Sequence, residues 1–314
     1  MAAKHDFTLY WNNLITYEGC PQCFLWNRGW GDIDVGGGPG RKKPKPVKKS
    51  AHHKIMGLVI QSAVETFYNE ELWRKPEGLK HRLVRMTKAA FTQELAKHYV
   101  DWRQAPGQAE MVRVCCDGVL GYMRTMKYHR FLGSYARAEV NLRGWIDKRN
   151  PLGGYADVII RREDTGITIL DGKNSTTKGK YVDPDQLRFY ALCFYLAYNA
   201  MPDRLAFVWY RYPYDGKDET GVEWIEFTKR DLQTLAKRAL EARQKMNKEE
   251  FDATPNSATC RFCDYETVCP ERKAMREADP RSRPRVSLPT VDEATGFVEF
   301  DLNSPVHSTS RSGK

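Results

Sequence analysis

The stretch Gly166-Ile167-Thr168-Ile169-Leu170-Asp171-Gly172-Lys173 joins a strand-forming run to two charged side chains. β-Branched and aliphatic residues dominate its first part, which is typical of a β-strand. Strand side chains alternate between the two faces, so Asp171 and Lys173 are predicted to share one face. A carboxylate beside an ammonium suits phosphodiester hydrolysis, because hard oxygens bind Mg²⁺ or Mn²⁺ and a lysine orients or deprotonates the attacking water. A surface Asp–Lys pair at a strand end is the ordinary alternative, and the tripeptide alone does not decide between the two.

A second carboxylate precedes this strand. Asp157 lies fourteen residues before Asp171, in the apolar stretch Gly154-Tyr155-Ala156-Asp157-Val158-Ile159-Ile160. If the two strands form a hairpin, the two carboxylates converge on one divalent cation, with the Lys173 ammonium beside it.

A buried helix is predicted downstream. Asp183-Pro184-Asp185 has the composition of a helix start, with an Asp N-cap and proline at the first helical position. Residues 186–196 are too apolar all round for a surface helix. Gln186 and Tyr190 are four residues apart and share a face, so both are expected to reach the same cleft.

These three motifs, in this order, resemble the PD-(D/E)XK nuclease superfamily and in particular its RecB-like branch. There a G-x-x-D strand, a (D/E)-x-K strand and a helix beginning with Q-x-x-x-Y follow one another. The resemblance implies an α/β restriction-endonuclease-like core, in which helices flank a mixed sheet, and a Mg²⁺- or Mn²⁺-dependent deoxyribonuclease activity. It also implies a site in which Lys173 orients the water, Gln186 and Tyr190 position Lys173 or the scissile phosphate, and the metal is held by Asp157, Asp171 and the main-chain carbonyl of Gly172.

One position departs from the family pattern. RecB-like enzymes commonly carry G-x-x-x-H-x-x-x-E on an early helix, whereas Gln61 stands at the histidine position between Gly57 and Glu65. A glutamine carbonyl coordinates a hard cation more weakly than imidazole and without its preference for transition metals. We therefore expect Gln61 either to be a weak metal ligand or to contact the metal ligands without binding the metal itself. Glu139 occupies a predicted strand where the family often has a glutamate, and an exposed strand carboxylate is the equally ordinary alternative.

The eight cysteines give independent information. No signal peptide is visible, so a reducing, cytoplasmic compartment is expected, and disulfides are not. Cys260-x₂-Cys263-x₅-Cys269 is a compact set of thiolates that needs a fourth ligand, with Cys20 as the leading candidate and Cys23 as its substitute. Similar layouts occur in AddB-type nucleases and in the iron–sulfur exonucleases of CRISPR adaptation, and this resemblance implies a 4Fe–4S cluster. Zinc suits four thiolates equally well on chemical grounds.

The charge balance predicts a polyanionic partner. The formal net charge is +10 and the pI is about 9.1, which favours DNA. A Gly/Pro/Lys-rich segment at 31–51 is predicted to be a mobile basic loop, with a solubilising linker as the alternative. Its candidate DNA contacts are Arg41, Lys42, Lys43, Lys45, Lys48 and Lys49. No apolar run is long enough to cross a membrane, so no membrane association is expected.

The expected organisation is a single nuclease domain over residues 1–277. Its parts are the basic loop at 31–51, a helical cap at 54–130, a β-β-β-α-β nuclease core at 134–250 and a cluster-binding segment at 251–277, followed by a flexible tail at 278–314. Within them, the patterns predict helices at Lys54–Trp73, Leu79–Trp102, Ala109–His129 and Lys229–Glu249. Strands are predicted at Tyr135–Trp145, Tyr155–Arg161, Gly166–Asp171, Arg204–Tyr212 and Val222–Phe227.

The predicted function is a DNA exonuclease that acts on single strands or ends in recombination, repair or a related phage or CRISPR process. No G-x-x-x-x-G-K-[ST] motif occurs in the sequence, so any helicase is expected to be a partner protein. The alternative is a nucleic-acid-binding or partner module that keeps the fold with little activity, which the missing histidine favours and the intact acidic residues and lysine oppose.

Overall fold

The computed structural model describes residues 7–29, 45–46, 49–179, 182–213, 221–278, 290–291 and 298–299. Its helices are α1 (Trp11–Gly19), α2 (Pro21–Arg28), α3 (His52–Asn69), η1 (Leu72–Arg74), α4 (Leu79–Lys97), α5 (Gln108–Tyr128), α6 (Pro184–Tyr198), α7 (Lys229–Asn247), α8 (Ser257–Cys260) and α9 (Pro270–Ala278). Its strands are β1 (Leu9–Tyr10), β2 (Tyr135–Trp145), β3 (Pro151–Arg162), β4 (Gly166–Lys173), β5 (Arg204–Trp209), β6 (Val222–Ile225), β7 (Thr290–Val291) and β8 (Val298–Glu299).

Six strands form one mixed sheet. Its order is β1-β3-β4-β5-β6, with β2 on β3, while β7 and β8 pair separately. The β2–β3, β3–β4 and β5–β6 pairs are antiparallel, and β1–β3 and β4–β5 are parallel. The parallel β4–β5 pair is connected through α6, so the β-β-β-α-β order expected from the sequence is present as β2-β3-β4-α6-β5.

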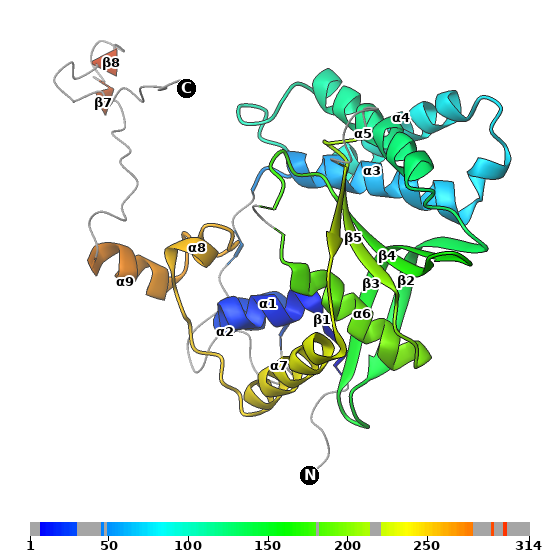
Figure 1. Ribbon diagram of the computed structural model, residues 1–314. Helices are drawn as coiled ribbons and strands as arrows, with labels where there is room; N and C mark the ends of the chain where they lie inside the picture. The colour runs from blue at the N-terminus through cyan, green and yellow to red at the C-terminus, as the bar shows by residue number, and fades with distance from the viewer. Residues whose placement is uncertain are drawn as a thin grey trace, which may run out of the picture.

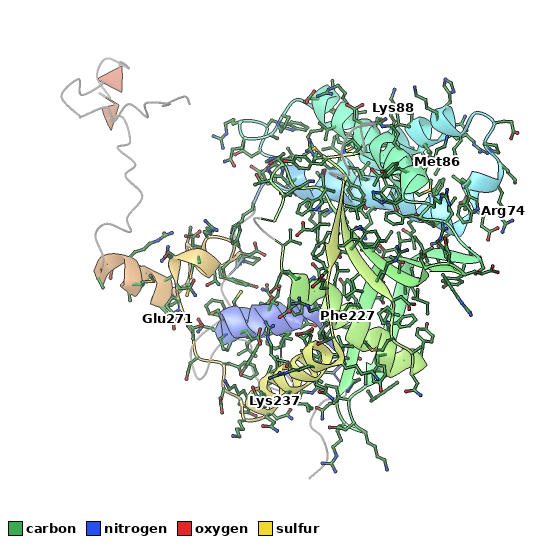
Figure 2. All side chains as sticks on the ribbon, in the orientation of Figure 1. Arg74, Met86, Lys88, Phe227, Lys237 and Glu271 are labelled. Atoms are coloured by element: carbon green, nitrogen blue, oxygen red, sulfur yellow. The ribbon has the colours of Figure 1, made fainter. Side chains whose placement is uncertain are left out.

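Helices cover the sheet from both sides (Figure 1). One hydrophobic core lies between the sheet and α1, α2, α6 and α7, and includes Phe189, Phe207 and Trp209. The second lies between the sheet and α3, α4 and α5, and includes Ile60, Val119 and Tyr210. Figure 2 shows the side chains that fill the space between these layers. The fold is therefore α/β, with a mixed sheet flanked by helices.

The helices predicted between Lys54 and His129 and most predicted strands are present in the structure, but several boundaries differ. The strand predicted at Tyr135–Trp145 matches β2 at both ends. The strand predicted from Tyr155 begins four residues earlier, at Pro151, and the helix predicted to reach Trp102 ends at Lys97, because His98 adopts an extended backbone. Helices α1 and α2 were not predicted, although α2 has proline at its first position.

Part of the predicted basic loop and most of the predicted tail lie outside the described residues. No helix in the described ranges is both long and apolar enough to span a bilayer.

Candidate active site

Asp157 lies where β4 separates from β3. The β3–β4 pairing reaches Leu170, which is opposite Val158, and β4 then continues beside β5 as far as Lys173. Asp157 Oδ2 accepts a hydrogen bond of 2.7 Å from the main-chain N–H of Gly172. This bond fixes the first carboxylate against the strand end that carries the second carboxylate and the lysine.

Lys173 is held by a carboxylate and an amide. Its ammonium forms an ion pair with Asp171 and donates a hydrogen bond of 2.8 Å to Gln186 Oε1. The Gln186 amide group donates to Asp171 Oδ1 at 3.0 Å and to the Tyr190 hydroxyl at 3.1 Å. The Asp171 side chain is 3% exposed and that of Lys173 is 21% exposed, so the ammonium faces solvent from above a buried carboxylate. The structure thus brings four of the predicted site residues into one network.

Glu139 and Gln61 join the site from β2 and α3. The Gln61 amide group donates to Glu139 Oε1 and, at 3.2 Å, to Asp157 Oδ1. Glu139 has a left-handed backbone with φ of 53°, between the β2–β3 pairs Ala138↔Val158 and Val140↔Ala156. Such a backbone costs a non-glycine residue roughly 1–2 kcal/mol and is concentrated at functional sites. Glu139 is therefore part of the cluster and not an exposed strand carboxylate.

The carboxylates are close enough to disfavour each other's charge. Burial raises the pKa of Asp157 well above its usual range, and the neighbouring charge of Asp171 raises it further. Burial also raises the pKa of Asp171 and of Glu139. A bound cation would relieve this repulsion, because it favours the charged forms.

The chemistry of the donor set, and not its arrangement, fits a hard divalent cation. Among the described residues, no group of three or more His, Cys, Asp or Glu side chains is arranged to hold a metal ion. Asp171 Oδ2 is buried and accepts no hydrogen bond from the described residues, but the Lys173 ammonium forms an ion pair with it. Asp157 and Asp171 therefore provide carboxylate oxygens of the kind that Mg²⁺ prefers, and neither sulfur nor imidazole lies in this cluster to select a softer metal.

Tyr210 is a site neighbour that the sequence did not single out. A Cβ atom at Gly172 would lie 1.8 Å from the Tyr210 hydroxyl oxygen, so the ring closes directly against the main chain of the Asp171–Lys173 motif. The Tyr210 N–H also donates to the Lys173 carbonyl at 2.9 Å. Burial, together with the negative charge of Asp157, raises the pKa of Tyr210, so its hydroxyl stays protonated. The available signal was its place directly after β5, the parallel neighbour of β4.

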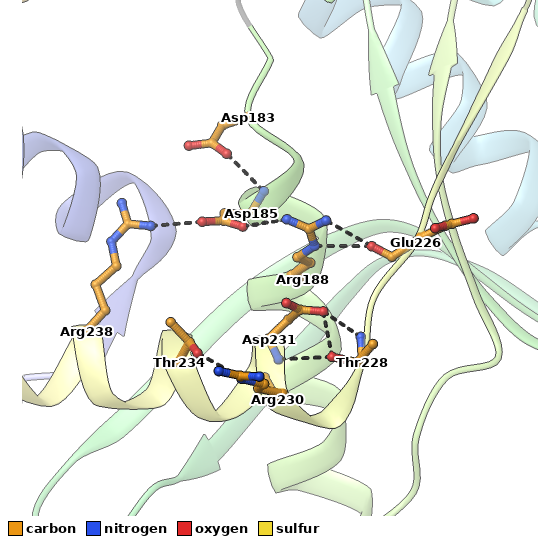
Figure 3. A network of polar contacts seen from close by, with 9 residues as sticks. All are labelled: Asp183, Asp185, Arg188, Glu226, Thr228, Arg230, Asp231, Thr234 and Arg238. Atoms are coloured by element: carbon orange, nitrogen blue, oxygen red, sulfur yellow. Dashed lines mark hydrogen bonds and ion pairs between the residues drawn. The ribbon is translucent and has the colours of Figure 1, made fainter.

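The start of α6 is anchored by the polar network in Figure 3. The Asp183 side chain accepts from the Asp185 N–H at 2.9 Å, which caps the helix as predicted. Arg188 joins Asp185 at 2.9 Å to the Glu226 carbonyl at 3.0 Å, and Arg238 of α7 reaches Asp185 at 3.1 Å. These contacts fix the first turn of α6, from which Gln186 reaches the site.

Five cysteines line a separate cavity of about 420 Å³ between α1, α2 and the segment 253–272. They are Cys20, Cys23, Cys260, Cys263 and Cys269. The Cys23 and Cys263 sulfur atoms are 3.4 Å apart, and the hydrogen bond with Cys23 lowers the pKa of Cys263 to about 6. The structure thus gathers all predicted thiolates and also Cys23, whereas Cys115 and Cys193 are buried elsewhere. Sulfur is the donor that iron–sulfur clusters and zinc prefer, although no three of the described cysteines are arranged to hold a metal ion.

The predicted DNA-contacting residues have mixed placement. Arg41, Lys42, Lys43 and Lys48 lie outside the described residues, and Lys45 is exposed. The Lys49 ammonium donates to the carbonyl oxygens of Arg261 at 3.3 Å and Cys263 at 2.8 Å. Lys49 therefore connects the basic segment to the cysteine-lined cavity.

One comparison with known proteins identifies the family of the chain. The family model described as the PD-(D/E)XK nuclease superfamily matches residues 12–270. A solved structure described as the crystal structure of SSO0001 covers 70% of this chain and 97% of its own, with 18% identity and a TM-score of 0.32. No curated protein matches the chain. Since the family model spans most of the sequence and includes every residue of the cluster, the chain belongs to the PD-(D/E)XK nuclease superfamily.

Proposed function

We propose that the protein is a Mg²⁺- or Mn²⁺-dependent deoxyribonuclease that degrades single-stranded or end-containing DNA. Membership of the superfamily indicates a nuclease with a nucleic-acid substrate, and enzymes of this superfamily generally use divalent metals such as Mg²⁺. The observation that carries the proposal is the network of Asp157, Asp171, Lys173 and Gln186 at the point where β4 leaves β3.

Each side chain has a role that follows from its contacts. Asp157, Asp171 and the Gly172 carbonyl would hold the cation, with Glu139 and Gln61 beside them. When bound, the cation would polarise the scissile phosphate and acidify a water molecule. Asp171 and Gln186 engage the Lys173 ammonium, and its third N–H donor would orient the attacking water and offset charge on the phosphoryl oxygens. Gln186 holds Lys173 in place and takes its own orientation from Asp171 and Tyr190.

The test measures degradation of end-labelled single-stranded and double-stranded DNA with Mg²⁺ or Mn²⁺. Lys173→Ala is expected to slow cleavage by about 10²–10⁴-fold, as removal of a proton-transfer or charge-stabilising group does. Lys237→Ala is the matched control, because Lys237 is a solvent-exposed residue of α7. Equal rates for the wild type and Lys173→Ala, or no cleavage by either, would contradict the nuclease. Ladder formation from one labelled end separates exonuclease from endonuclease cleavage.

The second candidate is a nucleic-acid-binding or partner module without activity. The Gln61 amide favours it, because this group lies against both Glu139 and Asp157 where the family has a metal-binding histidine. DNA binding without metal-dependent cleavage by the wild type would support the module over the enzyme. Recombination or repair, with a helicase partner, is the process that we propose for an active enzyme.

We further propose that the cysteine-lined cavity holds a 4Fe–4S cluster, with zinc as the alternative. Cys20, Cys260, Cys263 and Cys269 are the proposed ligands, and Cys23 is the substitute for Cys20. Iron, sulfide and zinc are measured in protein that has been purified anaerobically, and the visible absorbance is recorded. Loss of the metal is expected in Cys263→Ser but not in Cys193→Ser. Cys193 is a buried thiol of the hydrophobic core between the sheet and α1, α2, α6 and α7, and it does not line the cavity. Comparing Cys20→Ser with Cys23→Ser identifies the fourth ligand.

A further inference from the structure

The β2–β3 hairpin continues beyond the active site with one face left open. On its other face, Gly144 and Gly154 lie against α6, since a Cβ atom there would be 2.4 Å from Leu196 and 2.8 Å from the Tyr190 ring. Alternation then places Asn141, Arg143, Trp145 and Tyr155 on the opposite face. All four are exposed.

The exposed side chains on this face are mainly aromatic rings and a guanidinium group. Trp145 is 50% exposed and Tyr155 is 47% exposed. The Tyr10 ring, from β1, lies parallel to the Tyr155 ring, with an interplanar angle of 5° and centroids 6.2 Å apart. The Arg143 guanidinium lies 5.3 Å from the centroid of the Trp145 ring. We call Tyr10, Arg143, Trp145 and Tyr155 the hairpin platform.

The hairpin platform begins beside the catalytic cluster. Tyr155 precedes Asp157 by two residues on β3, which corresponds to roughly 7 Å along a strand. Trp145 is paired with Pro151, four residues further along β3 from Tyr155, or roughly another 13 Å. A strand whose phosphate lies at Asp157 would therefore place its neighbouring nucleotides over these rings.

The charge near the hairpin platform suits a polyanion. Arg143 forms no ion pair with any described residue, and the same is true of Lys148 and Arg149 in the turn that joins β2 to β3. The one carboxylate of this turn, Asp147, accepts hydrogen bonds from the Arg149 N–H at 2.8 Å and from Asn150 at 2.7 Å. Arg143 and Lys148 are thus available to phosphates. Arg149 instead lowers the pKa of the Asp147 carboxyl group, first through its main-chain N–H and then through its charge.

We propose that the hairpin platform binds single-stranded DNA by stacking unpaired bases on Trp145 and Tyr155, and so directs single strands to the catalytic cluster. This inference rests on the proposed nuclease function and names its preferred substrate. Aromatic side chains bind single strands in this way because every base has a π-face, and cationic groups along the groove hold the backbone. The bases of an intact duplex are stacked on one another and cannot offer these faces.

The experiment measures DNA binding by the full chain carrying Lys173→Ala, so that cleavage does not interfere. Fluorescence anisotropy at fixed salt compares an oligo-dT strand, an abasic strand of equal length and a duplex. Trp145→Ala and Tyr155→Ala are expected to weaken oligo-dT binding by about 5- to 100-fold each, with little effect on the abasic strand or the duplex. Trp145→Phe and Tyr155→Phe retain a ring and are expected to retain most of the affinity.

Trp102→Ala and Tyr99→Ala are the matched controls, because each of these side chains is 50% exposed and lies outside the hairpin platform. Circular dichroism and thermal melting establish that every variant is folded. Equal weakening of oligo-dT and abasic strands, or weakening by the control variants of the same size, would overturn the proposal. DNA cleavage is measured separately in chains with Lys173 intact. A protein that shows the predicted binding pattern but does not cleave DNA contradicts only the proposed nuclease activity. A protein that cleaves DNA but binds oligo-dT equally well after Trp145→Ala and Tyr155→Ala contradicts only the role proposed for the hairpin platform.

Discussion

Removal of Gln186 should separate the positioning of Lys173 from the binding of DNA. Gln186 accepts from the Lys173 ammonium at 2.8 Å and donates to Asp171 Oδ1 at 3.0 Å. Gln186→Ala deletes both contacts and leaves the ammonium with its ion pair to Asp171 and its position 5.1 Å from the centroid of the Phe207 ring. The lysine is then held less firmly above Asp171, while the two carboxylates stay on their strands.

The structure sets the expected size of the effect. Asp171 is 2% exposed, so the loss of a donor leaves a buried acceptor oxygen unsatisfied, at a cost of about 1–3 kcal/mol in stability. Misplacement of a catalytic group by about 1 Å lowers rates by about 10²-fold. Gln186→Ala should therefore lower kcat by about that factor, with KM for DNA nearly unchanged.

Tyr190→Phe is the matched control. The Tyr190 hydroxyl accepts from the same amide group at 3.1 Å, and Lys173 donates to Gln186 and not to this hydroxyl. We expect its kcat to stay within about threefold of the wild type, as for the loss of one modest hydrogen bond. Single-turnover cleavage and thermal melting are measured for both variants. A folded Gln186→Ala protein that cleaves at the rate of Tyr190→Phe would refute the positioning role.

Three further predictions concern the cation, the strained backbone and the packing of the motif. Burial raises the pKa of Asp157 in the folded protein above its ordinary value of 3.8. The stability that this group contributes is therefore present below pH 3.8 and is lost as the pH rises through the raised pKa. Mg²⁺ should therefore raise the Tm more at pH 8 than at pH 5, and an equal rise at both would contradict this linkage. In urea denaturation, Glu139→Gly should have a free energy of unfolding about 1 kcal/mol higher than that of Glu139→Ala. Both variants lose the carboxylate, but only glycine adopts a φ of 53° without strain. Gly172→Ala should destabilise the protein by about 1–3 kcal/mol in chemical denaturation, because its Cβ would lie 1.8 Å from the Tyr210 oxygen. Gly57→Ala, in the middle of α3 with its nearest contact at 4.0 Å, should be neutral or stabilising by about 0.5–1 kcal/mol, and destabilisation by both would undermine the packing argument.

The elements that the sequence predicted well are those with a local signal, such as a regular alternation of side chains or a helix-start motif. The β4 segment and the start of α6 are examples, since β-branched alternation and an Asp–Pro start are local signals. These two elements, with Asp157 from β3, carry most of the cluster. The order of the motifs was therefore enough to predict the order of the strands and helix around the site, and to predict that these residues lie close together.

The remaining features depend on contacts between distant segments. The first residues of β3, Pro151 to Gly154, have a turn-like composition, yet they form a strand because they pair with β2 on one side and, at Leu152 and Gly153, with β1 on the other. Tyr210 reaches the site only through the β4–β5 pairing. Lys49 belongs by composition to a basic loop, but its ammonium donates to two carbonyl oxygens more than two hundred residues away. No local pattern reports such contacts.

The contacts of Gln61 connect the departure from the family motif to the energetics of the site. The Gln61 amide group lies between two partly buried carboxylates and donates one hydrogen bond to Glu139 and one to Asp157. A neutral amide relieves less repulsion than a divalent charge, which agrees with the raised pKa of both carboxyl groups. A cation held by Asp157 as proposed would replace these hydrogen bonds, and Gln61 would contribute to its binding only through the amide oxygen. A glutamine oxygen is a weaker ligand than imidazole but a hard one, so we expect a lower affinity for the cation than with histidine and an unchanged preference for Mg²⁺.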